Sequence, residues 1–414
     1  LKEYKIDGFR FDLSKGFTQK NTGDNVGAWS QYDAARITTW KKYYDTVQTK
    51  SSNAYVILEH FAENNEEKEL AEYGMLLWGN MNYNYTEAAM GWLTNSNFSG
   101  AIHTQRNWSQ PHLVSYMESH DEERMMYKLK NFGNASGSYT TKDVPTALKR
   151  VELSAAFFFT IPGPKMLWQF GEVGYDYSIN HCPDGTVNNN CRVDNKPIRW
   201  DYMAEPARKQ VYNLFSNLIH LRFHPWYKAA FMSNRVEYNL AGAFKWIKVT
   251  TDTSNVVVIG NFDVAPVTGQ VTFQNAGVWY DYLNNTTYSA TGAAQSFTLA
   301  PGAFHVYVNR NVNNVATTPG GNPPATGNEL VLQLYPNPAP GAFTVDVQVP
   351  QSGNLKVNLL NNVGQHVATL QNGNVINGRH KLVFNRQALP VSGGHYFLQV
   401  QSISGTKTIQ VTLQ

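Results

Sequence analysis

The chain has 414 residues, which is long enough for about two to four domains. With 42% hydrophobic and 16% charged residues it has a globular composition, which excludes the disordered and fibrous classes. The net charge of +3 is spread along the chain without blocks of Lys or Arg, so we expect binding neither to nucleic acid nor to an anionic membrane. No apolar run approaches the roughly 18–20 residues that span a bilayer, so we expect no transmembrane segment.

Residues 1–228 alternate apolar runs with helical patterns. Four apolar runs predict short buried strands: residues 6–13, 54–61, 112–119 and 164–171. Helical patterns fall at three places: residues 32–47, 146–160 and 206–224. Apolar strands that alternate with helices predict a parallel sheet covered by helices. Each of the first three strands has a carboxylate at or just past its end, and catalytic groups collect at the carboxyl ends of the strands in a (β/α) barrel.

The first two strand ends carry candidate catalytic carboxylates. In GFRFDLSKG (8–16), Arg10 lies close to Asp12, and an Arg beside a carboxylate holds it ionised and oriented, as suits a nucleophile. The alternative is an Arg–Asp pair that only ties down the strand end. In VILEHF (56–61), Glu59 ends an apolar run, where partial desolvation favours the protonated form that a general acid needs. Taken alone, Glu59 could equally be a salt-bridged rim residue.

A third cluster follows the strand predicted at 112–119. MESHDEERM (117–125) places His120 and Asp121 directly after that strand. Either residue alone is more often structural than functional. We expect the charged residues 122–124 to form a solvated start to the next helix.

The two cysteines lie in a loop rich in Gly and Asn. Cys182 and Cys191 in HCPDGTVNNNCRVD are close enough in sequence to close a small ring through a disulfide, and two free thiols are the alternative. A structural zinc site needs four ligands, so we predict no metal here. A disulfide would imply an oxidising, extracytoplasmic setting.

Beyond residue 228 the pattern becomes β-rich. Residues 229–310 contain short apolar runs separated by Gly, Asn and Asp turns, which predicts an antiparallel sandwich. Residues 311–328 have the Pro, Gly, Asn and Thr composition of a linker. Residues 329–414 predict a second small all-β domain.

The three carboxylate clusters, together with IPGPKMLWQFGE (161–172), resemble the conserved regions of glycoside hydrolase family 13, the α-amylase family, in order, spacing and strand context. The resemblance covers residues 1–310. It implies an α/β fold in which residues 1–228 are the C-terminal part of a catalytic (β/α)8 TIM barrel, about strands 4–8. Residues 229–310 would then be the β-sandwich domain C, and with the last domain the chain would have two all-β sandwiches.

The family's third-strand Asn-His motif is absent, and the fourth-strand motif already begins by residue 6. We therefore expect this chain to be a fragment whose first barrel strands lie upstream of Leu1. Open parallel edges aggregate, so we expect the fragment alone to be inactive and poorly soluble.

The resemblance assigns a role to each carboxylate. Asp12 would be the nucleophile that forms a covalent glycosyl-enzyme, and Glu59 the general acid/base. Retaining chemistry places these two carboxyl groups about 5–5.5 Å apart. Asp121 would bind the hydroxyls of the reacting sugar and stabilise the transition state. Three further residues of the same motifs are expected to contact or orient the substrate site: Arg10, His120 and Lys15.

No cofactor is assigned firmly by the resemblance, which leaves calcium open. Many family members have a His after the fourth-strand Lys that shapes a glucose subsite or a calcium site. Here Lys15 is followed by Gly16, which weakens the calcium expectation.

The function implied is hydrolysis of α-1,4-glucosidic bonds in starch-like glucans, with an α-glucan polysaccharide or oligosaccharide as the partner. One alternative is an α-glucan transglycosylase such as a branching enzyme, which shares the same three carboxylates. The other is a catalytically dead surface protein that only binds glycan.

The last domain carries a second resemblance. LYPNPAPGAFTVDVQV (334–349), with Pro336 and Pro338 before its first long strand, is similar to the opening of the C-terminal sorting domain of the bacterial type IX secretion system, a small Ig-like sandwich. This implies contact with the type IX secretion machinery and a protein that is secreted or attached to the outer-membrane surface. An ordinary adhesive or carbohydrate-binding sandwich is the alternative.

Overall fold

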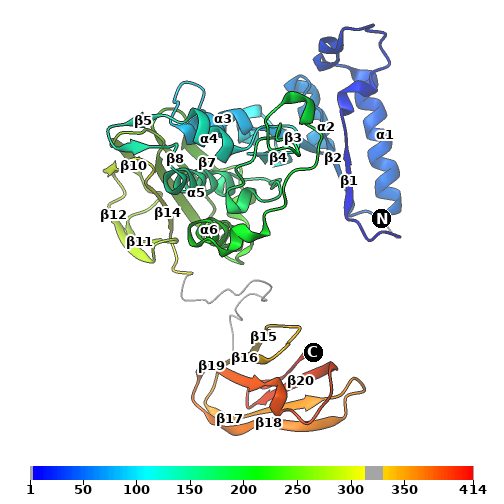
Figure 1. Cartoon of the computed structure of the whole chain (residues 1–414), viewed down its shortest axis with the longest axis vertical. Coiled ribbons are helices and arrows are strands. Elements are labelled where there is room, and N and C mark those ends of the chain that lie inside the picture. The colour runs from blue at the N-terminus through cyan, green and yellow to red at the C-terminus, as the bar shows by residue number, and fades with distance from the viewer. Residues whose placement is uncertain (1–2, 313–329, 414) are drawn as a thin grey trace. The chain divides into compact units, whose positions relative to one another are not determined.

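The computed structural model describes residues 3–312 and 330–413, so the predicted linker 311–328 lies almost wholly outside the described residues. The chain divides into two compact units, Leu1–Asn314 and Val315–Gln414, which are described separately below (Figure 1). The finer division at residues 228 and 310 stays a prediction. Among the described residues, no helix combines the length and the apolar character that crossing a bilayer requires.

The first unit contains a parallel sheet at its N-terminal end. Its four strands lie in the order β1-β2-β3-β4, and every neighbouring pair is parallel. The strands are β1 (Gly8–Phe11), β2 (Tyr55–Leu58), β3 (Leu76–Asn80) and β4 (Leu113–Tyr116). Three of the four predicted strands and the parallel arrangement are thus confirmed, and β3 is an addition.

The strand predicted at 164–171 is wrong. Only Lys165 pairs with the sheet, through a single parallel bridge to Ser115, and the segment then turns. Pro162 and Pro164 precede it, and proline donates no hydrogen bond to a ladder. The run PKMLWQFG forms an irregular segment instead, in which Phe170 is buried while Leu167 is exposed.

The described part of the first unit, residues 3–312, contains six α-helices, which are labelled in Figure 1. They are α1 (Ala34–Lys50), α2 (Asn64–Tyr73), α3 (Asn82–Met90), α4 (Met125–Phe132), α5 (Val144–Thr160) and α6 (Pro206–Phe223). The predicted helices at 32–47, 146–160 and 206–224 are therefore confirmed as α1, α5 and α6. Short 3-10 helices are η1 (Ser14–Phe17), η2 (Val26–Ser30), η3 (Ser99–Ala101), η4 (His103–Arg106), η5 (Gly171–Val173), η6 (Asn189–Cys191), η7 (Trp200–Ala204) and η8 (Ala230–Met232).

The two faces of the parallel sheet pack against different partners. On one face, Trp40 of α1 and Leu70 of α2 share a core with Leu58 and Leu77 of the strands. On the other face, Trp78 packs with Val114, Tyr116 and Ile57. Because successive side chains of a strand alternate between faces, the residues next to Leu58 and Leu77 point to this second face.

The remainder of the first unit is an antiparallel sandwich. Its six-stranded sheet has the order β12-β11-β14-β9-β8-β7, and a second sheet pairs β10 with β13. The strands are β7 (Val236–Asn239), β8 (Phe244–Thr250), β9 (Asn255–Asn261), β10 (Val267–Thr272), β11 (Gly277–Asp281), β12 (Thr286–Ala290), β13 (Ala294–Leu299) and β14 (Phe304–Val308). A small hairpin precedes them in the chain, β5 (Ala135–Ser136) with β6 (Tyr139–Thr140).

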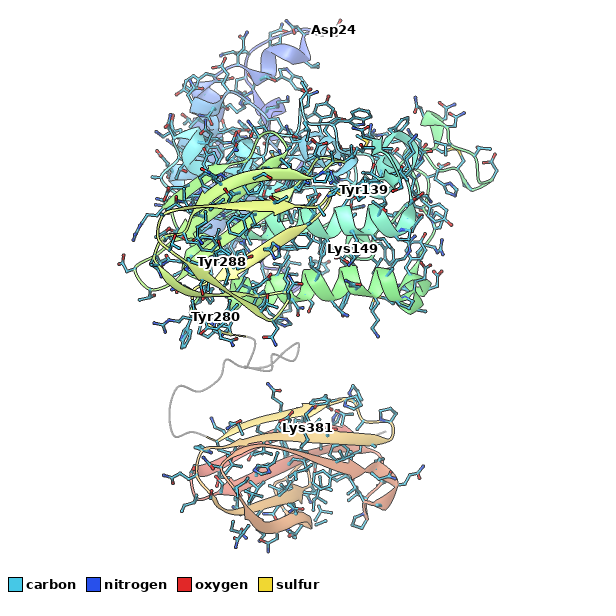
Figure 2. The ribbon with its side chains drawn as sticks, turned by 90° about the vertical axis from the view of Figure 1, so that its left-hand side faces the viewer. Asp24, Tyr139, Lys149, Tyr280, Tyr288 and Lys381 are labelled. Carbon is cyan, nitrogen blue, oxygen red and sulfur yellow. A yellow bond between two sulfur atoms is a disulfide. The ribbon has the colours of Figure 1, made fainter. Side chains whose placement is uncertain are left out.

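Helix α5 joins the sandwich to the helices of the first unit. Phe157 of α5, Phe262 and Val258 lie in one hydrophobic core. Figure 2 shows α5, labelled at Lys149, beside the strands that carry Tyr280 and Tyr288. The buried Arg150 of α5 donates hydrogen bonds to main-chain carbonyls on both sides, among them those of Ala89 and Asp263.

The second unit is an antiparallel β-sandwich with a core of its own. It consists of a three-stranded sheet, β15-β16-β19, and a four-stranded sheet, β18-β17-β20-β21, which share one hydrophobic core. The strands are β15 (Val331–Tyr335), β16 (Ala342–Val349), β17 (Gly353–Leu360), β18 (His366–Val375), β19 (Gly378–Asn385), β20 (Gly394–Ser402) and β21 (Gly405–Leu413), with the 3-10 helix η9 (Arg386–Ala388) before β20. The β-rich character predicted for the C-terminal parts is confirmed.

Candidate active site

The three predicted carboxylates follow strands of one parallel sheet. Asp12 comes directly after β1, Glu59 directly after β2, and Asp121 a few residues after β4. The carboxyl ends of parallel strands lie at one edge of a sheet. The fold therefore brings three segments that are far apart in the sequence to one edge.

Arg10 joins the first two carboxylates. Its Nη1 donates a hydrogen bond to Asp12, and its Nη2 lies 2.9 Å from Glu59 Oε2 in an ion pair. Its guanidinium carbon lies 4.2 Å from the centre of the Trp78 ring, within the range of a cation–π contact. The Arg10 hydrogen bond lowers the pKa of Asp12 below its usual value of 3.8, so Asp12 is an anion at neutral pH.

Asp12 and Glu59 differ in exposure. The Asp12 side chain is 75% exposed and the Glu59 side chain 13% exposed. Glu59 Oε2 also accepts a hydrogen bond of 2.9 Å from the main-chain N–H of Leu13. Leu13 has a left-handed backbone (φ 42°), which is uncommon for a residue with a side chain, and this turn aims its N–H at Glu59.

A buried hydrogen-bond chain supports the turn that follows Asp12. Ser14 Oγ donates to the main-chain oxygen of Glu59 at 2.9 Å and lies 2.8 Å from His60 Nδ1. His60 Nε2 lies 2.8 Å from Glu66 Oε1, and Arg36 donates to both oxygens of Glu66 at 2.6 and 2.8 Å. This chain, which the sequence analysis did not find, fastens the end of β1 to the end of β2.

The pKa values in that chain follow its burial. Burial lowers the pKa of His60, so its imidazole is neutral at pH 7. Burial raises the pKa of Glu66, but the hydrogen bonds from His60 and Arg36 outweigh it and leave that pKa lowered. A neutral His60 has one ring proton, which Nε2 donates to the anionic Glu66. Nδ1 is then an acceptor, and the single proton of the Ser14 hydroxyl serves both His60 Nδ1 and the main-chain oxygen of Glu59.

Asp121 has two basic neighbours. Its Oδ2 lies 3.3 Å from His120 Nε2, and its Oδ1 accepts a hydrogen bond of 3.0 Å from Arg192 Nη2. The His120 ring lies 6.1 Å from the Trp78 ring and 6.0 Å from the Trp168 ring, between centroids. Trp78 thus lies next to both Arg10 and the His120 ring, and it links the segment that carries the third carboxylate to the first two.

Lys15 lies in η1 close to the end of β2. Its Nζ donates to Ser30 Oγ at 3.1 Å and to the main-chain oxygen of Phe61 at 3.4 Å. Lys15 therefore lies near the end of β2, and its amine is hydrogen-bonded to other residues of the protein. Its predicted contact with substrate stays a prediction.

The charged residues 122–124 are less exposed to solvent than predicted. Arg124 is buried and donates to the main-chain oxygen of Glu122 at 2.8 Å. Glu123 accepts hydrogen bonds from Ser178 Oγ at 2.6 Å and from the Ile179 N–H at 2.8 Å. The prediction of a solvated helix start is wrong here, because these residues fasten the segment after β4 to the segment at 178–179, and α4 begins only at Met125.

Two further acids have shifted pKa values, Glu118 just after β4 and Glu172 in η5. Burial raises the pKa of both Glu118 and Glu172. Glu118 accepts a hydrogen bond of 2.6 Å from the Met125 N–H, and it lines a small cavity with Met117, Met166 and Trp168.

Cys182 and Cys191 form a disulfide with a Cα–Cα distance of 5.2 Å. Among residues 3–312 and 330–413, no group of three or more His, Cys, Asp or Glu side chains could hold a metal ion. These residues do not supply an acidic cage for calcium.

The arrangement suits chemistry on a polar, neutral ligand. The exposed Asp12 and the shielded Glu59 share Arg10, which lies on the Trp78 ring. Asp121 follows His120, whose ring lies near the same tryptophan. Carboxylates and histidine can bind hydroxyl groups, and the face of a tryptophan ring can pack on the C–H face of a sugar.

Solved structures with a similar fold are those of α-amylase-family proteins. A structure of AmyP in complex with maltose is 16% identical, with a TM-score of 0.51, over 74% of this chain and 64% of that chain. A variant of AmyP in complex with maltotriose is also 16% identical, with a TM-score of 0.52, over 74% of this chain and 65% of that chain. CldA, a cyclomaltodextrin glucanotransferase with a three-domain ABC distribution, is 16% identical, with a TM-score of 0.51, over 68% of this chain and 56% of that chain.

These matches establish a shared fold, and the chain spans somewhat less than two thirds of the length of each of the three solved structures. Residues 333–414 match the family model described as a secretion system C-terminal sorting domain. No curated protein matches the chain.

Proposed function

We propose that this chain carries the catalytic carboxylates of a retaining α-glucan-active glycosidase of the α-amylase type, which hydrolyses α-1,4-glucosidic bonds. The observation that carries the proposal is Arg10, whose guanidinium pairs with both Asp12 and Glu59 at neighbouring strand ends. The complexes of AmyP with maltose and maltotriose support a similar ligand class for this fold.

Each residue has a distinct role in the proposed mechanism. Asp12, held as an anion by Arg10, attacks the anomeric carbon and forms a glycosyl-enzyme, while the proton on Glu59 passes to the leaving oxygen. Glu59 then takes the proton of the incoming water, which breaks the glycosyl–Asp12 bond. Asp121 and His120 bind hydroxyls of the same sugar, and Lys15, which lies beside the end of β2, contacts the substrate from there.

The first test separates catalysis from binding. Asp12→Asn and Glu59→Gln are made in the longest open reading frame that contains this chain, and turnover and affinity for maltotriose are measured. Both variants should lose turnover by about 10³-fold or more and keep the affinity within about threefold. Undiminished turnover by Asp12→Asn would overturn the assignment of the nucleophile.

A transglycosylase is the second candidate, because the fold matches the glucanotransferase CldA as well as it matches AmyP. Hydrolysis and transfer differ in whether water or a sugar hydroxyl resolves the glycosyl-enzyme. Incubation with a soluble α-glucan distinguishes them, since hydrolysis increases the number of reducing ends and transfer leaves it constant. Binding without either reaction would favour a protein that only binds glycan.

We also propose that the first unit is part of a larger barrel. Among the described residues, β1 pairs with β2 alone, so its other edge has no strand partner. A parallel sheet of four strands is too narrow to close into a barrel of eight. Further strands upstream of β1 would complete it, and the upstream reading frame tests this directly.

The match of residues 333–414 to a sorting domain implies export. We propose that the type IX machinery recognises this unit and that the protein is released or held at the outer surface. Deletion of residues 330–414 should leave the protein inside a cell that has this machinery, as measured by cell fractionation. Unchanged export would contradict the proposal.

A further inference from the structure

The segment between η5 and η7 reaches back over the candidate active site. It contains the Cys182–Cys191 disulfide, and Arg192 directly follows the second cysteine. Arg192 Nη2 donates to Asp121 twice, to the main-chain oxygen at 2.6 Å and to Oδ1 at 3.0 Å. We propose that Arg192 is a positioning residue for Asp121 and that the disulfide loop 182–191 exists to place it. This inference rests on the proposed function of Asp121 in binding sugar.

The contact fixes the plane of the Asp121 carboxylate. Arg192 holds Oδ1 and the main-chain oxygen, while His120 lies at Oδ2. A carboxylate held at both oxygens cannot rotate freely, so it presents its remaining lone pairs in one direction. A residue that binds two hydroxyls of one sugar ring needs such a fixed direction.

The ion pair between Arg192 and Asp121 is not strong enough by itself to hold Arg192 in this position. The side chains of Arg192 and Asp121 are 48% and 47% exposed, and exposed pairs contribute little because water competes and both side chains lose rotamer freedom. The position of Arg192 must therefore come from the backbone that carries it.

That backbone is fastened on both sides of Arg192. Before it, Cys191 is bonded to Cys182, which is buried. After it, Lys196 Nζ donates to the main-chain oxygens of Cys191 at 2.6 Å and of Asp194 at 2.8 Å.

The loop is also fastened at its base. Glu123, two residues after Asp121, accepts the hydrogen bonds from Ser178 and Ile179. The segment is therefore bonded close to Asp121 at two points, before the loop at residues 178–179 and after it at Arg192. Covalent closure between these two points limits how far Arg192 can move from Asp121.

Exposure along the loop fits this role. Residues 183–190 are all exposed, Val187 among them, so they contribute little to a core. Their order comes from short-range bonds such as Asn180 Nδ2 to Asn189 Oδ1 at 2.9 Å and Cys182 N to the Thr186 oxygen at 2.8 Å. Such a loop loses its shape without the cross-link.

The experiment compares six forms of the longest open reading frame that contains this chain. Five are the wild type, Arg192→Gln, Arg192→Lys, the double variant Cys182→Ser/Cys191→Ser and the triple variant that combines Arg192→Gln with both serines, and the sixth is a control. Arg235→Gln is the matched control, since it removes another exposed Arg–Asp pair, with Asp252 at 2.7 Å, from the β-sandwich. Hydrogen exchange of the peptide that covers residues 117–125 reports order at Asp121, and calorimetry reports maltotriose affinity.

Arg192→Gln and the double serine variant should each speed exchange at residues 119–122 and weaken maltotriose binding by about three- to tenfold. Arg192→Lys keeps the charge and should recover part of both losses. Combining Arg192→Gln with the two serines should cost no more than either change alone, because both act through one contact. The control should match the wild type.

The outcomes separate this inference from the proposed function. If the serine variant leaves exchange at Asp121 unchanged while Arg192→Gln raises it, the loop does not position Arg192 and the inference is wrong. If both raise exchange but maltotriose affinity is unaffected, Arg192 has a structural role only, which also overturns it. If no form binds maltotriose, the proposed function of this chain is contradicted, and exchange still shows whether the loop holds Arg192 on Asp121.

Discussion

At the scale of single residues, Arg10 determines the charge state around the candidate nucleophile. It donates to Asp12, pairs with Glu59 and lies over Trp78. A lysine at this position could not hold both carboxylates in a fork, because its ammonium is a single point of charge. The two carboxylates therefore depend on one planar group.

The first prediction concerns the titration of Asp12. Arg10→Gln should raise the Asp12 pKa, because the charged donor that lowers it is lost. The folded-state pKa is depressed, so the Arg10–Asp12 contact stabilises the fold above the unfolded pKa and is lost as pH falls through the folded pKa. Carboxyl NMR of the wild type should show Asp12 titrating below 3.8. A titration at or above that value in the wild type would contradict the role of Arg10.

The second prediction concerns the buried chain behind the site. His60→Ala removes a partner from both Ser14 and Glu66, which are buried. The cost should be about 2–4 kcal/mol, since it leaves a cavity and an incompletely paired buried polar group. Urea unfolding monitored by tryptophan fluorescence measures it. Thr38→Ala is the control, because Thr38 is exposed and its side chain bonds within its own helix, and it should change stability by less than about 0.5 kcal/mol.

At the scale of elements, α2 carries a buried acid whose charge state should affect stability. Burial raises the pKa of Glu67 to about 7, despite its ion pair with Arg106 at 3.1 Å. Because this pKa is higher in the folded state than in the unfolded state, protonated Glu67 stabilises the fold. That stabilisation is fully present below the unfolded pKa of 4.5 and is lost as pH rises through about 7. The wild type should therefore lose up to about 3 kcal/mol between pH 5 and pH 8. Glu67→Gln should lose less over the same range in denaturant titrations, and an equal loss in both proteins would contradict this assignment.

The contact between α5 and β9 provides another prediction at this scale. A Cβ added at Gly260 would lie 2.6 Å from Leu153 Cδ1 and 2.8 Å from Phe157 Cε2, so helix and strand could not keep their spacing. Gly260→Ala should destabilise the first unit by about 1–3 kcal/mol. Gly100→Ala is the control, because its added Cβ would meet Met81 only at an ordinary contact distance of 3.4 Å.

The elements also show how far the sequence alone could reach. β1, β2, β4, α1, α5 and α6 follow from apolar periodicity, and the carboxylates follow from their positions at strand ends. The segment at 164–171 is apolar enough for a strand, but prolines before it and a turn within it prevent pairing, which periodicity does not register. Arg192 could not be found from its motif, because it meets Asp121 only through a loop that returns from 71 residues later in the sequence.

The same limit applies to the support behind the strand ends. His60 stands beside Glu59 in the sequence, yet its role depends on Glu66 and Arg36, which come from two different helices. Local pattern identifies residues that face a strand end. It does not identify partners that only tertiary packing brings together.

At the scale of the molecule, the two units have separate hydrophobic cores. The core of the second unit consists of residues from Leu330 to Leu413 alone. A unit with its own closed core is expected to fold by itself. Residues 330–414 expressed alone should therefore unfold cooperatively, as measured by circular dichroism on heating. A non-cooperative melt would contradict the independence of this unit.

The final prediction concerns the open edge of the parallel sheet in the first unit. Among the described residues, β1 pairs only with β2, and the large side chains near its outer edge include Ile6 and Phe9, which are both exposed. An unpaired strand edge with apolar side chains is a template for pairing with another chain. The polypeptide of residues 1–414 should therefore associate with itself as its concentration rises, as light scattering would detect.

Phe9→Lys places a charge on that edge, where pairing would bury it, and should reduce the association. Val278→Lys on β11 adds the same charge at an exposed position of the sandwich and should leave the association unchanged. Equal suppression by both variants would show that net charge controls association, and no association in the wild type would show that the edge of β1 is already protected.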